Sequence, residues 1–537
     1  MSIVARRHHL HHPIPPSPPS PCPSESSTLV DDYFKCSLIS LVKKHGSGKA
    51  TNGGQCTYAL ARLPAPTVNL CDVPAQTTID ILPDNALLEI FDFYLDGART
   101  EAWITLVHVS RKWRSVVFGS ARRLNLQLDC RGRRTPAKKT LQVWPLLPIV
   151  VSGVDNIIAA VTGKHNDRVC GIELWHVPCF QMQKVLAAMQ EPFPALTYLE
   201  LVSKDDETEV PIIPDSFLGG SAPRLRSLSL DRVSFPTLLR LLLSATDLVN
   251  LSLCGMPLSG YIPPEAMVTG LSGLTRLKSL WLEFQTPLLG SRRPSPPPAR
   301  RALLPALTHF EFKGFCEYLE DLVAGIDTPP LDDLNITFFY RFIFDTPQLS
   351  QFIGRTPNFM EPDEAYLKFS YSDFSVRLAR PGTTLRFAVS CTDSLWQLLS
   401  LTQLLASPLY QALIPTVERL YILDAEFLRR RWQNDINAEE SNQWLELLRP
   451  FTAVKDLFLY REFVPYFAAT LQALGAESVA ELLPALQWLF LENPWLSGSV
   501  QESIKQFVAS RRLSGDPIVV SLWSTGREKY KWYEIVD

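Results

Sequence analysis

The sequence has few of the features that mark secreted, membrane-spanning or disulfide-rich proteins. Its 537 residues include ten cysteines, but no C-x-x-C pair occurs, and the two closest cysteines are Cys170 and Cys179. A disulfide framework and a zinc ribbon are therefore not expected. No apolar run reaches the roughly 18 residues needed to cross a bilayer, and the first residues lack the apolar stretch of a signal peptide. We expect a cytoplasmic or nuclear location, or both, and no membrane partner.

A strong net charge is also missing. Lys and Arg number 52 against 55 Asp and Glu, which leaves a formal charge of −3. No global field therefore favours nucleic acid or an anionic membrane. Three local charged stretches, at 130–140, 204–209 and 429–431, are more typical of solvated loops and helix faces than of a binding patch. Nucleic acid is not an expected partner.

Motifs for catalysis and metal binding are lacking too. H-E-x-x-H, G-x-S-x-G and G-x-G-x-x-G do not occur, and GSGKAT at 46–51 has Lys43 where a phosphate-binding loop needs its first glycine. The histidines at 8, 9, 11 and 12 lie in a Pro-rich tract with no scaffold to orient them around a metal. We expect no cofactor, no metal site and no catalysis. An enzyme whose catalytic residues are far apart in the sequence stays an open alternative.

Composition divides the chain into a polar beginning and a longer apolar remainder. Hydrophobic residues make up 46% of the whole chain, so most of it can bury a core. Residues 1–76 are instead rich in Pro and Ser, with seven prolines between positions 13 and 23. Proline fixes an extended backbone and removes hydrogen-bond donors. We predict that residues 1–76 are a disordered arm.

Residues 80–120 contain three short apolar-periodic segments separated by polar turns. Pro83 suits the first turn of a helix, and Asp84 complements the helix dipole there. A unit of this size cannot enclose so many large apolar side chains, so the surplus should meet a partner. The alternative is a three-helix unit that belongs to the core of the next domain.

This region resembles the F-box. Three elements match in order: Leu82-Pro83, then L-L-E-I-F at 87–91, then V-x-V-S-R-x-W-R at 107–114. The closing R-R-L-N-L at 122–126, with Trp144-Pro145 downstream, resembles F-box proteins of mushroom-forming fungi. The sequence departs from the family at Asn85, where an acidic residue is common, and in lacking the usual closing Leu-Trp. We assign residues 77–125 to the F-box.

A different period begins near residue 167. The pattern apolar-x-x-apolar-x-apolar occurs ten times, starting at Val169, Leu196, Leu225, Leu248, Leu277, Leu307, Leu331, Val417, Val454 and Leu486. The last three positions alternate as in a half-buried strand. The pattern resembles leucine-rich repeats, in which each unit supplies one parallel strand and a helical return. A regular α/β domain of unrelated topology is the alternative.

We therefore predict an α/β protein with a three-helix F-box, a connecting segment at 126–165, and an irregular leucine-rich-repeat-like solenoid at 166–537. The interval between Leu331 and Val417 has room for two degenerate units, although the alternating stretch at 366–389 suggests a hairpin. The number of repeats and the structure of 337–416 stay open. Residues 517–523 and 530–536 have strand-forming side chains suited to capping the last repeat.

The resemblance implies a non-catalytic substrate receptor of an SKP–cullin–F-box ubiquitin ligase. In that family the F-box binds the Skp-type adaptor, and through it cullin, while the C-terminal domain holds a protein target that the sequence does not identify. The residues expected at the adaptor are Leu82, Pro83, Leu87, Leu88, Ile90, Phe91, Trp103, Val107 and Trp113. An interaction scaffold without ubiquitin-ligase function is the alternative.

We expect the target to bind the outward positions of the repeat strands, which align in neighbouring repeats. These positions mix aromatic, charged and small polar side chains, a composition that suits a protein surface better than a small apolar ligand. The candidates are Tyr198, Glu200, Arg226, Asn250, Lys278, Trp281 and His309. The alternative is that they are polar only because they face solvent.

Overall fold

The computed structural model describes residues 82–96, 102–121, 123–130, 147–204, 209–285, 301–339, 346–370, 372–391, 394–424, 438–474, 482–492, 498–523 and 533–534. All of them belong to one compact unit, residues 78–537. Several segments lie outside the described residues. They are the predicted arm with its histidines, most of the three charged stretches, and the Pro-rich segment at 286–300. None of the described helices is long and apolar enough to cross a bilayer.

Three short helices occupy the region that resembles the F-box. They are α2 (Asp84–Asp96), α3 (Ala102–Val107) and α4 (Arg111–Gly119). Phe91 and Trp113 join α2 to α4, with ring centres 4.8 Å apart. Ser110 caps α4, because its hydroxyl accepts a hydrogen bond from the backbone N–H of Trp113 at 3.2 Å. The Val-Ser-Arg-x-Trp segment thus has a structural role at a helix start.

The described strands form one sheet of 17 strands and a separate two-stranded pair, β8 (Ala302–Leu303) with β10 (Ile326–Asp327). In spatial order the large sheet runs β1 (Leu128–Cys130), β2 (Ile149–Ser152), β3 (Val169–Val177), β4 (Tyr198–Ser203), β5 (Ser227–Asp231), β6 (Asn250–Met256), β7 (Ser279–Phe284), β9 (His309–Gly314), β11 (Asp333–Phe339), β14 (Thr383–Ser390), β13 (Asp373–Arg380), β12 (Glu364–Phe369), β15 (Arg419–Asp424), β16 (Asp456–Leu459), β17 (Trp488–Glu492), β18 (Val519–Trp523) and β19 (Tyr533–Glu534). Neighbours are parallel except at β14–β13, β13–β12 and β18–β19.

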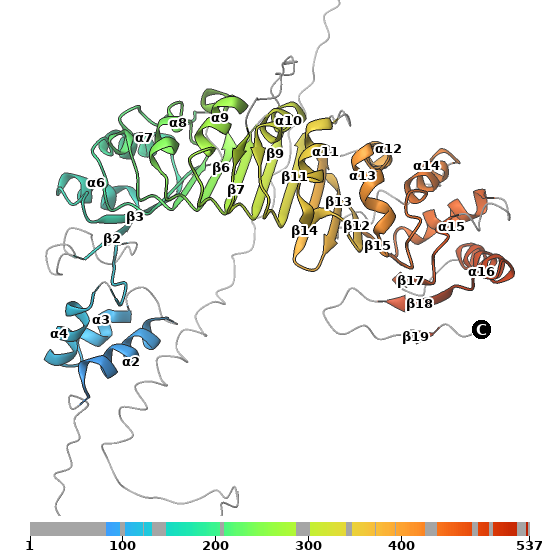
Figure 1. Ribbon diagram of the computed structural model, residues 1–537, viewed down its shortest axis with the longest axis horizontal. Coiled ribbons are helices and arrows are strands. Elements are labelled where there is room, and N and C mark those ends of the chain that lie inside the picture. Colours follow the sequence, from blue (N-terminus) through green and yellow to red (C-terminus); the bar gives the residue numbers. More distant parts are fainter. Residues whose placement is uncertain are drawn as a thin grey trace, which may run out of the picture. The chain divides into compact units, whose positions relative to one another are not determined.

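Helices return the chain from most strands to the next and lie on one side of the sheet (Figure 1). They are α6 (Val154–Thr162), α7 (Cys179–Ala188), α8 (Leu238–Ser244), α9 (Pro264–Leu271), α10 (Cys316–Ala324), α11 (Pro347–Gly354), α12 (Ser394–Leu405), α13 (Pro408–Leu413), α14 (Ala438–Leu448), α15 (Val464–Ala473) and α16 (Gly498–Leu513). Parallel strands need such crossovers, because a tight turn cannot reverse the chain and keep the strand direction.

The core is a set of apolar ladders between the sheet and these helices. Leu199, Leu228, Leu251, Leu280 and Phe310 pair in register from β4 to β9, and each is almost completely buried. Burying one such side chain contributes about 1.5–3 kcal/mol. These side chains occupy the repeated motif positions, and all ten predicted motifs contain a strand. The predicted mixed α/β architecture with a large, mainly parallel sheet is confirmed.

The sheet departs from the expected repeat pattern at both ends of the predicted array and in its middle. It begins at β1 and β2, inside the segment at 126–165 that we expected to be a connection. At the other end β18 extends the sheet and β19 pairs with it antiparallel, where a cap was expected. The capping strands are thus part of the sheet itself.

The middle of the sheet is not built from the two degenerate repeats that fit the interval. The chain instead forms an antiparallel meander of β12, β13 and β14, which lies between β11 and β15. Pro381 and Gly382 form the two-residue turn between β13 and β14, and Gly382 has φ +86°. A positive φ is accessible to glycine without strain, so this turn fixes the register of the two strands.

Candidate functional site

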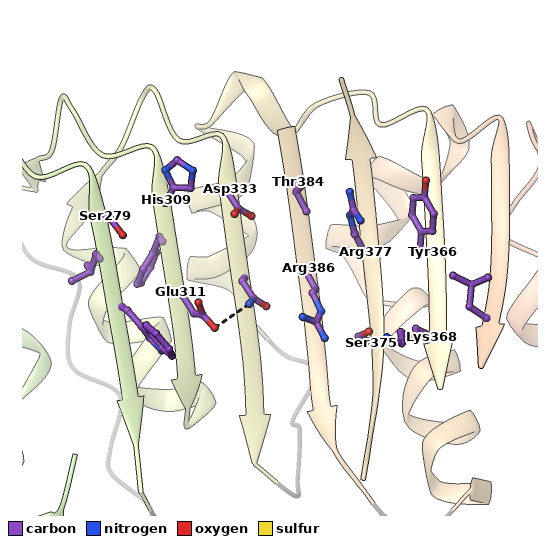
Figure 2. Close-up of a pocket in the computed structure, with 15 residues that line it drawn as sticks. Ser279, His309, Glu311, Asp333, Tyr366, Lys368, Ser375, Arg377, Thr384 and Arg386 are labelled. Atoms are coloured by element: carbon purple, nitrogen blue, oxygen red, sulfur yellow. Dashed lines mark hydrogen bonds between the residues drawn. The ribbon is translucent and has the colours of Figure 1, made fainter. Parts of the chain in front are cut away.

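Side chains alternate across each strand, so those of one face pack against the helices and those of the other point away from them. None of the described helices covers this second face, which we call the open face (Figure 1). A pocket of about 670 Å³ lies on the open face between β7 and β15. Its charged and aromatic side chains stand on the neighbouring strands from β7 to β12, in front of the helices (Figure 2). The lining residues are Ser279, Leu280, Trp281, His309, Phe310, Glu311, Asp333, Asn335, Tyr366, Lys368, Ser375, Arg377, Thr384, Arg386 and Leu423.

Three cations from the meander share this pocket. Arg386 on β14 is the register partner of Arg377 on β13. Lys368 lies on the next strand, β12, two residues after Tyr366, which is the register partner of Arg377. Within the described parts of the chain, none of the three forms an ion pair or donates a hydrogen bond. Like charges this close repel each other, which disfavours the arrangement unless an anion is present.

Tyr366 holds the Arg377 guanidinium in place. The guanidinium carbon lies 5.0 Å from the centre of the Tyr366 ring, and the Tyr421 ring stacks against Tyr366 at 4.5 Å between centres. The Tyr366 hydroxyl donates a 2.7 Å hydrogen bond to Glu364, which also pairs with Arg419 at 2.8 Å. Burial, with the hydrogen bond to Glu364, raises the pKa of Tyr366. The ring is therefore a fixed, uncharged platform for the arginine.

Acidic side chains lie at the other side of the pocket, on β9 and β11 (Figure 2). Glu311 accepts a hydrogen bond from the Asn335 amide at 3.1 Å. Burial raises the pKa of Glu311, and the nearby Asp333 carboxylate adds to this shift, whereas the charge of Arg386 opposes it. The pocket thus has an acidic side and a basic side, and Arg386 is the cation nearest to the boundary.

An aromatic ladder continues from the basic side of the pocket along the open face. Tyr421, Phe458 and Phe490 pair in register on β15, β16 and β17. Their rings stack with centres 4.3 and 4.4 Å apart and planes tilted by only 10° and 14°. Trp523 packs edge-on against Phe458 at 5.4 Å. Aromatic cross-strand pairs of this kind stabilise a sheet, so the ladder is a rigid border for the pocket.

A second pocket of about 630 Å³ adjoins the first at the turn between β13 and β14. His309, Asp333, Arg377 and Thr384 line both pockets. The two hollows therefore form one continuous depression across the middle of the open face.

The structure divides the predicted target-binding residues into three sets. Trp281 and His309 line the pocket. Tyr198, Glu200 and Asn250 lie on β4 and β6 of the same sheet, and the Tyr198 hydroxyl donates a hydrogen bond to Glu200. Arg226 and Lys278 immediately precede β5 and β7, where they are exposed and their carbonyl groups accept bonds from the next strand.

The predicted adaptor-binding residues are divided in a similar way. Six of them are buried among the helices: Leu87, Leu88, Phe91, Trp103, Val107 and Trp113. Ile90 is 47% exposed, Pro83 is exposed and Leu82 is half-buried. Phe93, which was not among the candidates, is 87% exposed. Only the exposed residues are placed for direct contact with another protein.

Sequence reasoning missed the basic side of the pocket. Lys368, Arg377 and Arg386 belong to the stretch whose structure the repeat pattern left open, so their proximity was not predictable from the repeat. A signal was present in the alternation of polar and apolar residues on both sides of Pro381-Gly382. Read as a hairpin with a two-residue turn, that stretch places Arg377 opposite Arg386.

No protein-family model and no curated protein sequence matches this chain. Among the residues that the structure describes, no three His, Cys, Asp or Glu side chains gather as a metal site would require. The pocket is lined mainly by charged, polar and aromatic side chains, a composition that suits recognition of a polar ligand.

Proposed function

We propose that this protein is a substrate-recognition subunit of an SKP–cullin–F-box ubiquitin ligase. Its helices α2, α3 and α4 would be the F-box that binds a Skp-type adaptor. Its sheet and return helices would be a leucine-rich-repeat-like domain that holds a protein target on the open face. The family's sequence elements at 82–114 suggest this assignment, and one structural observation supports it most directly.

That observation is the uneven burial of the large apolar residues on α2. Leu87 and Phe91 are fully buried against the other helices, whereas Ile90 and Phe93 are 47% and 87% exposed. A helix in a unit with no partner normally turns residues such as Phe93 inward. Two large apolar side chains left exposed on one short helix are typical of a surface that another protein covers.

The proposed mechanism requires no nucleophile from this chain. The adaptor and cullin would bring a ubiquitin-conjugating enzyme near a target held on the open face. Tethering raises the local concentration of the target's lysines at the loaded enzyme, which accelerates transfer without any new chemical group.

The test is affinity purification of the full chain under proteasome inhibition, followed by mass spectrometry. The proposal expects adaptor, cullin and a set of stabilised targets. Adaptor without cullin would instead support the scaffold, and turnover of a small molecule with neither partner would support an enzyme.

Two double variants make the adaptor assignment sharper. Ile90→Ser with Phe93→Ser removes the exposed apolar pair on α2 and should abolish adaptor capture. Leu243→Ser with Leu258→Ser is the matched control, because these residues are 54% and 58% exposed elsewhere in the chain. Leu82→Ala with Pro83→Ala should also weaken capture, by about 2 kcal/mol or roughly thirtyfold. Unchanged capture by both α2 and Leu82-Pro83 variants would refute the F-box assignment.

Target binding has its own test. Tyr198→Ala with Trp281→Ala removes the two aromatic candidates on the open face, and aromatic residues often dominate binding energy. If the set of co-purified targets is unchanged while the sheet stays folded, the target does not bind through these two residues.

A further inference from the structure

The open face of the sheet carries a feature that the proposed function does not require. Repeat strands need only polar side chains on a solvent-facing surface, and cations there normally alternate with acids. Elsewhere on this face they do so: Lys313 on β9 pairs with Glu283 on β7 at 2.7 Å, and Arg419 on β15 pairs with Glu364 at 2.8 Å. Lys368, Arg377 and Arg386 of the meander depart from this pattern.

In the meander, three cationic residues occupy adjacent strands of one pocket, with no acidic residue between them. Arg377 and Arg386 are register partners on adjacent strands, and Lys368 stands on the strand beyond Arg377. Glu364, at the start of β12, is already engaged, since it accepts a hydrogen bond from Tyr366 and pairs with Arg419. Glu311, at the other edge, accepts from Asn335.

The position of the Arg377 guanidinium is also fixed before any ligand binds. Tyr366 lies between Tyr421 and Arg377, so the guanidinium rests on an aromatic surface that is itself anchored through its hydroxyl. An arginine stacked in this way loses little freedom when its N–H groups bind a ligand, and its planar fork fits the paired oxygens of a carboxylate or phosphate.

We propose that the basic side of this pocket binds an anionic side chain of the target protein, held by Arg377, Arg386 and Lys368. The pocket volume of about 670 Å³ is sufficient for one side chain and part of the extended segment that carries it. The aromatic ladder from Tyr421 to Phe490 borders the basic side as a buried, rigid wall that keeps Tyr366 in place. The acidic side, at Glu311 and Asp333, repels an anionic side chain, so the bound segment must place its negative charge at the basic side.

This inference rests on the proposal that the open face binds the target, but its test does not require the adaptor. The purified full-length chain is applied to three arrays of short peptides of mixed sequence. The arrays share one fixed central position, which is serine, aspartate or phosphoserine. We expect the aspartate array, the phosphoserine array or both to bind at least about tenfold more strongly than the serine array.

The two anionic arrays distinguish the sources of charge. Equal binding means that the pocket reads a negative charge, and binding of phosphoserine alone means that it requires phosphate. Equal binding by all three arrays would overturn the inference. Because neither adaptor nor cullin is present, a loss of adaptor capture in the earlier test leaves this result unaffected.

Variants place the effect in the pocket. With Arg377→Gln and Arg386→Gln together, the anionic arrays should bind no more than about twofold more strongly than the serine array. Lys505→Gln with Arg512→Gln, on exposed positions of α16, removes the same charge and should leave the preference intact. Lys368→Gln is the second variant, since Lys368 is exposed and a single change there should reduce the preference several-fold without unfolding the sheet. A full preference in both pocket variants would refute the site.

Discussion

Arg377 on β13 and Arg386 on β14 are register partners in an antiparallel pair, so two positively charged residues occupy neighbouring positions on the open face. Opposite charges at such a position would stabilise the sheet, whereas like charges destabilise it. The turn at Pro381-Gly382 fixes this register, and the Tyr366 ring holds one of the two guanidiniums. The arrangement is therefore built into the fold, and it is the geometry on which the proposed anion site depends.

The first prediction concerns the stability cost of these charges. Arg377→Gln removes a repulsion and one cation–ring contact, and the two effects nearly cancel at about 0.5–1 kcal/mol each. Arg419→Gln removes ion pairs to Asp363 and Glu364 at 3.0 and 2.8 Å. Urea unfolding should therefore show less destabilisation for Arg377→Gln than for Arg419→Gln. The reverse ranking would contradict the view that Arg377 has no stabilising ion pair.

The second prediction concerns pH. Burial raises the pKa of Glu311, so the folded state holds the carboxyl proton more tightly than the unfolded state. This favours folding below the ordinary pKa of glutamate, and the benefit is lost as pH rises through the raised pKa of the folded state. Glu311→Gln keeps an acceptor for Asn335 but cannot ionise. The variant should gain stability relative to the unmodified protein as pH rises from acid to neutral, measured by urea unfolding at several pH values. A gain that grows toward acid would have the wrong sign.

The third prediction concerns the aromatic ladder. Phe458 is buried between Tyr421 and Phe490, with ring centres 4.3 and 4.4 Å away. Phe458→Ala removes both stacks and should lower the free energy of unfolding by about 3–5 kcal/mol. Trp488, on the same sheet, is 37% exposed, so Trp488→Ala should cost clearly less. Comparable losses for the two variants in thermal or urea unfolding would show that the ladder is not a buried cluster.

The ten repeated motifs predicted their strands because each needs a buried side chain at every second position. Leu228 and Leu251, for example, lie in one ladder because both occupy the same motif position. The motif does not predict strand direction, since buried and exposed side chains alternate in the same way along parallel and antiparallel strands. The meander at β12–β14 was therefore compatible with two extra repeats until the pairing of Arg377 with Arg386 was known.

The helices of the N-terminal region show a second limit of the same kind. Their apolar residues cover more than one face, so periodicity alone does not separate core from surface. Leu87 and Ile90 are both large and aliphatic, yet only Ile90 is exposed. The difference arises from packing against α3 and α4, which the sequence of α2 does not contain. The adaptor candidates were correspondingly a mixture of core and surface residues.

The last prediction separates these two roles on α2. Phe91 is fully buried and packs 4.8 Å from Trp113, whereas Phe93, two residues later, is 87% exposed. Phe91→Ala should destabilise the three helices by about 3–5 kcal/mol, because it opens a cavity and removes the contact with α4. Phe93→Ala should leave their stability within about 0.5 kcal/mol and still reduce adaptor capture. Hydrogen exchange of the backbone amides of α2, α3 and α4 measures local stability, and pull-down with purified adaptor measures binding. If Phe93→Ala speeds exchange as much as Phe91→Ala, Phe93 belongs to the core of the unit. If it alters neither exchange nor capture, the exposed face of α2 is not the adaptor surface.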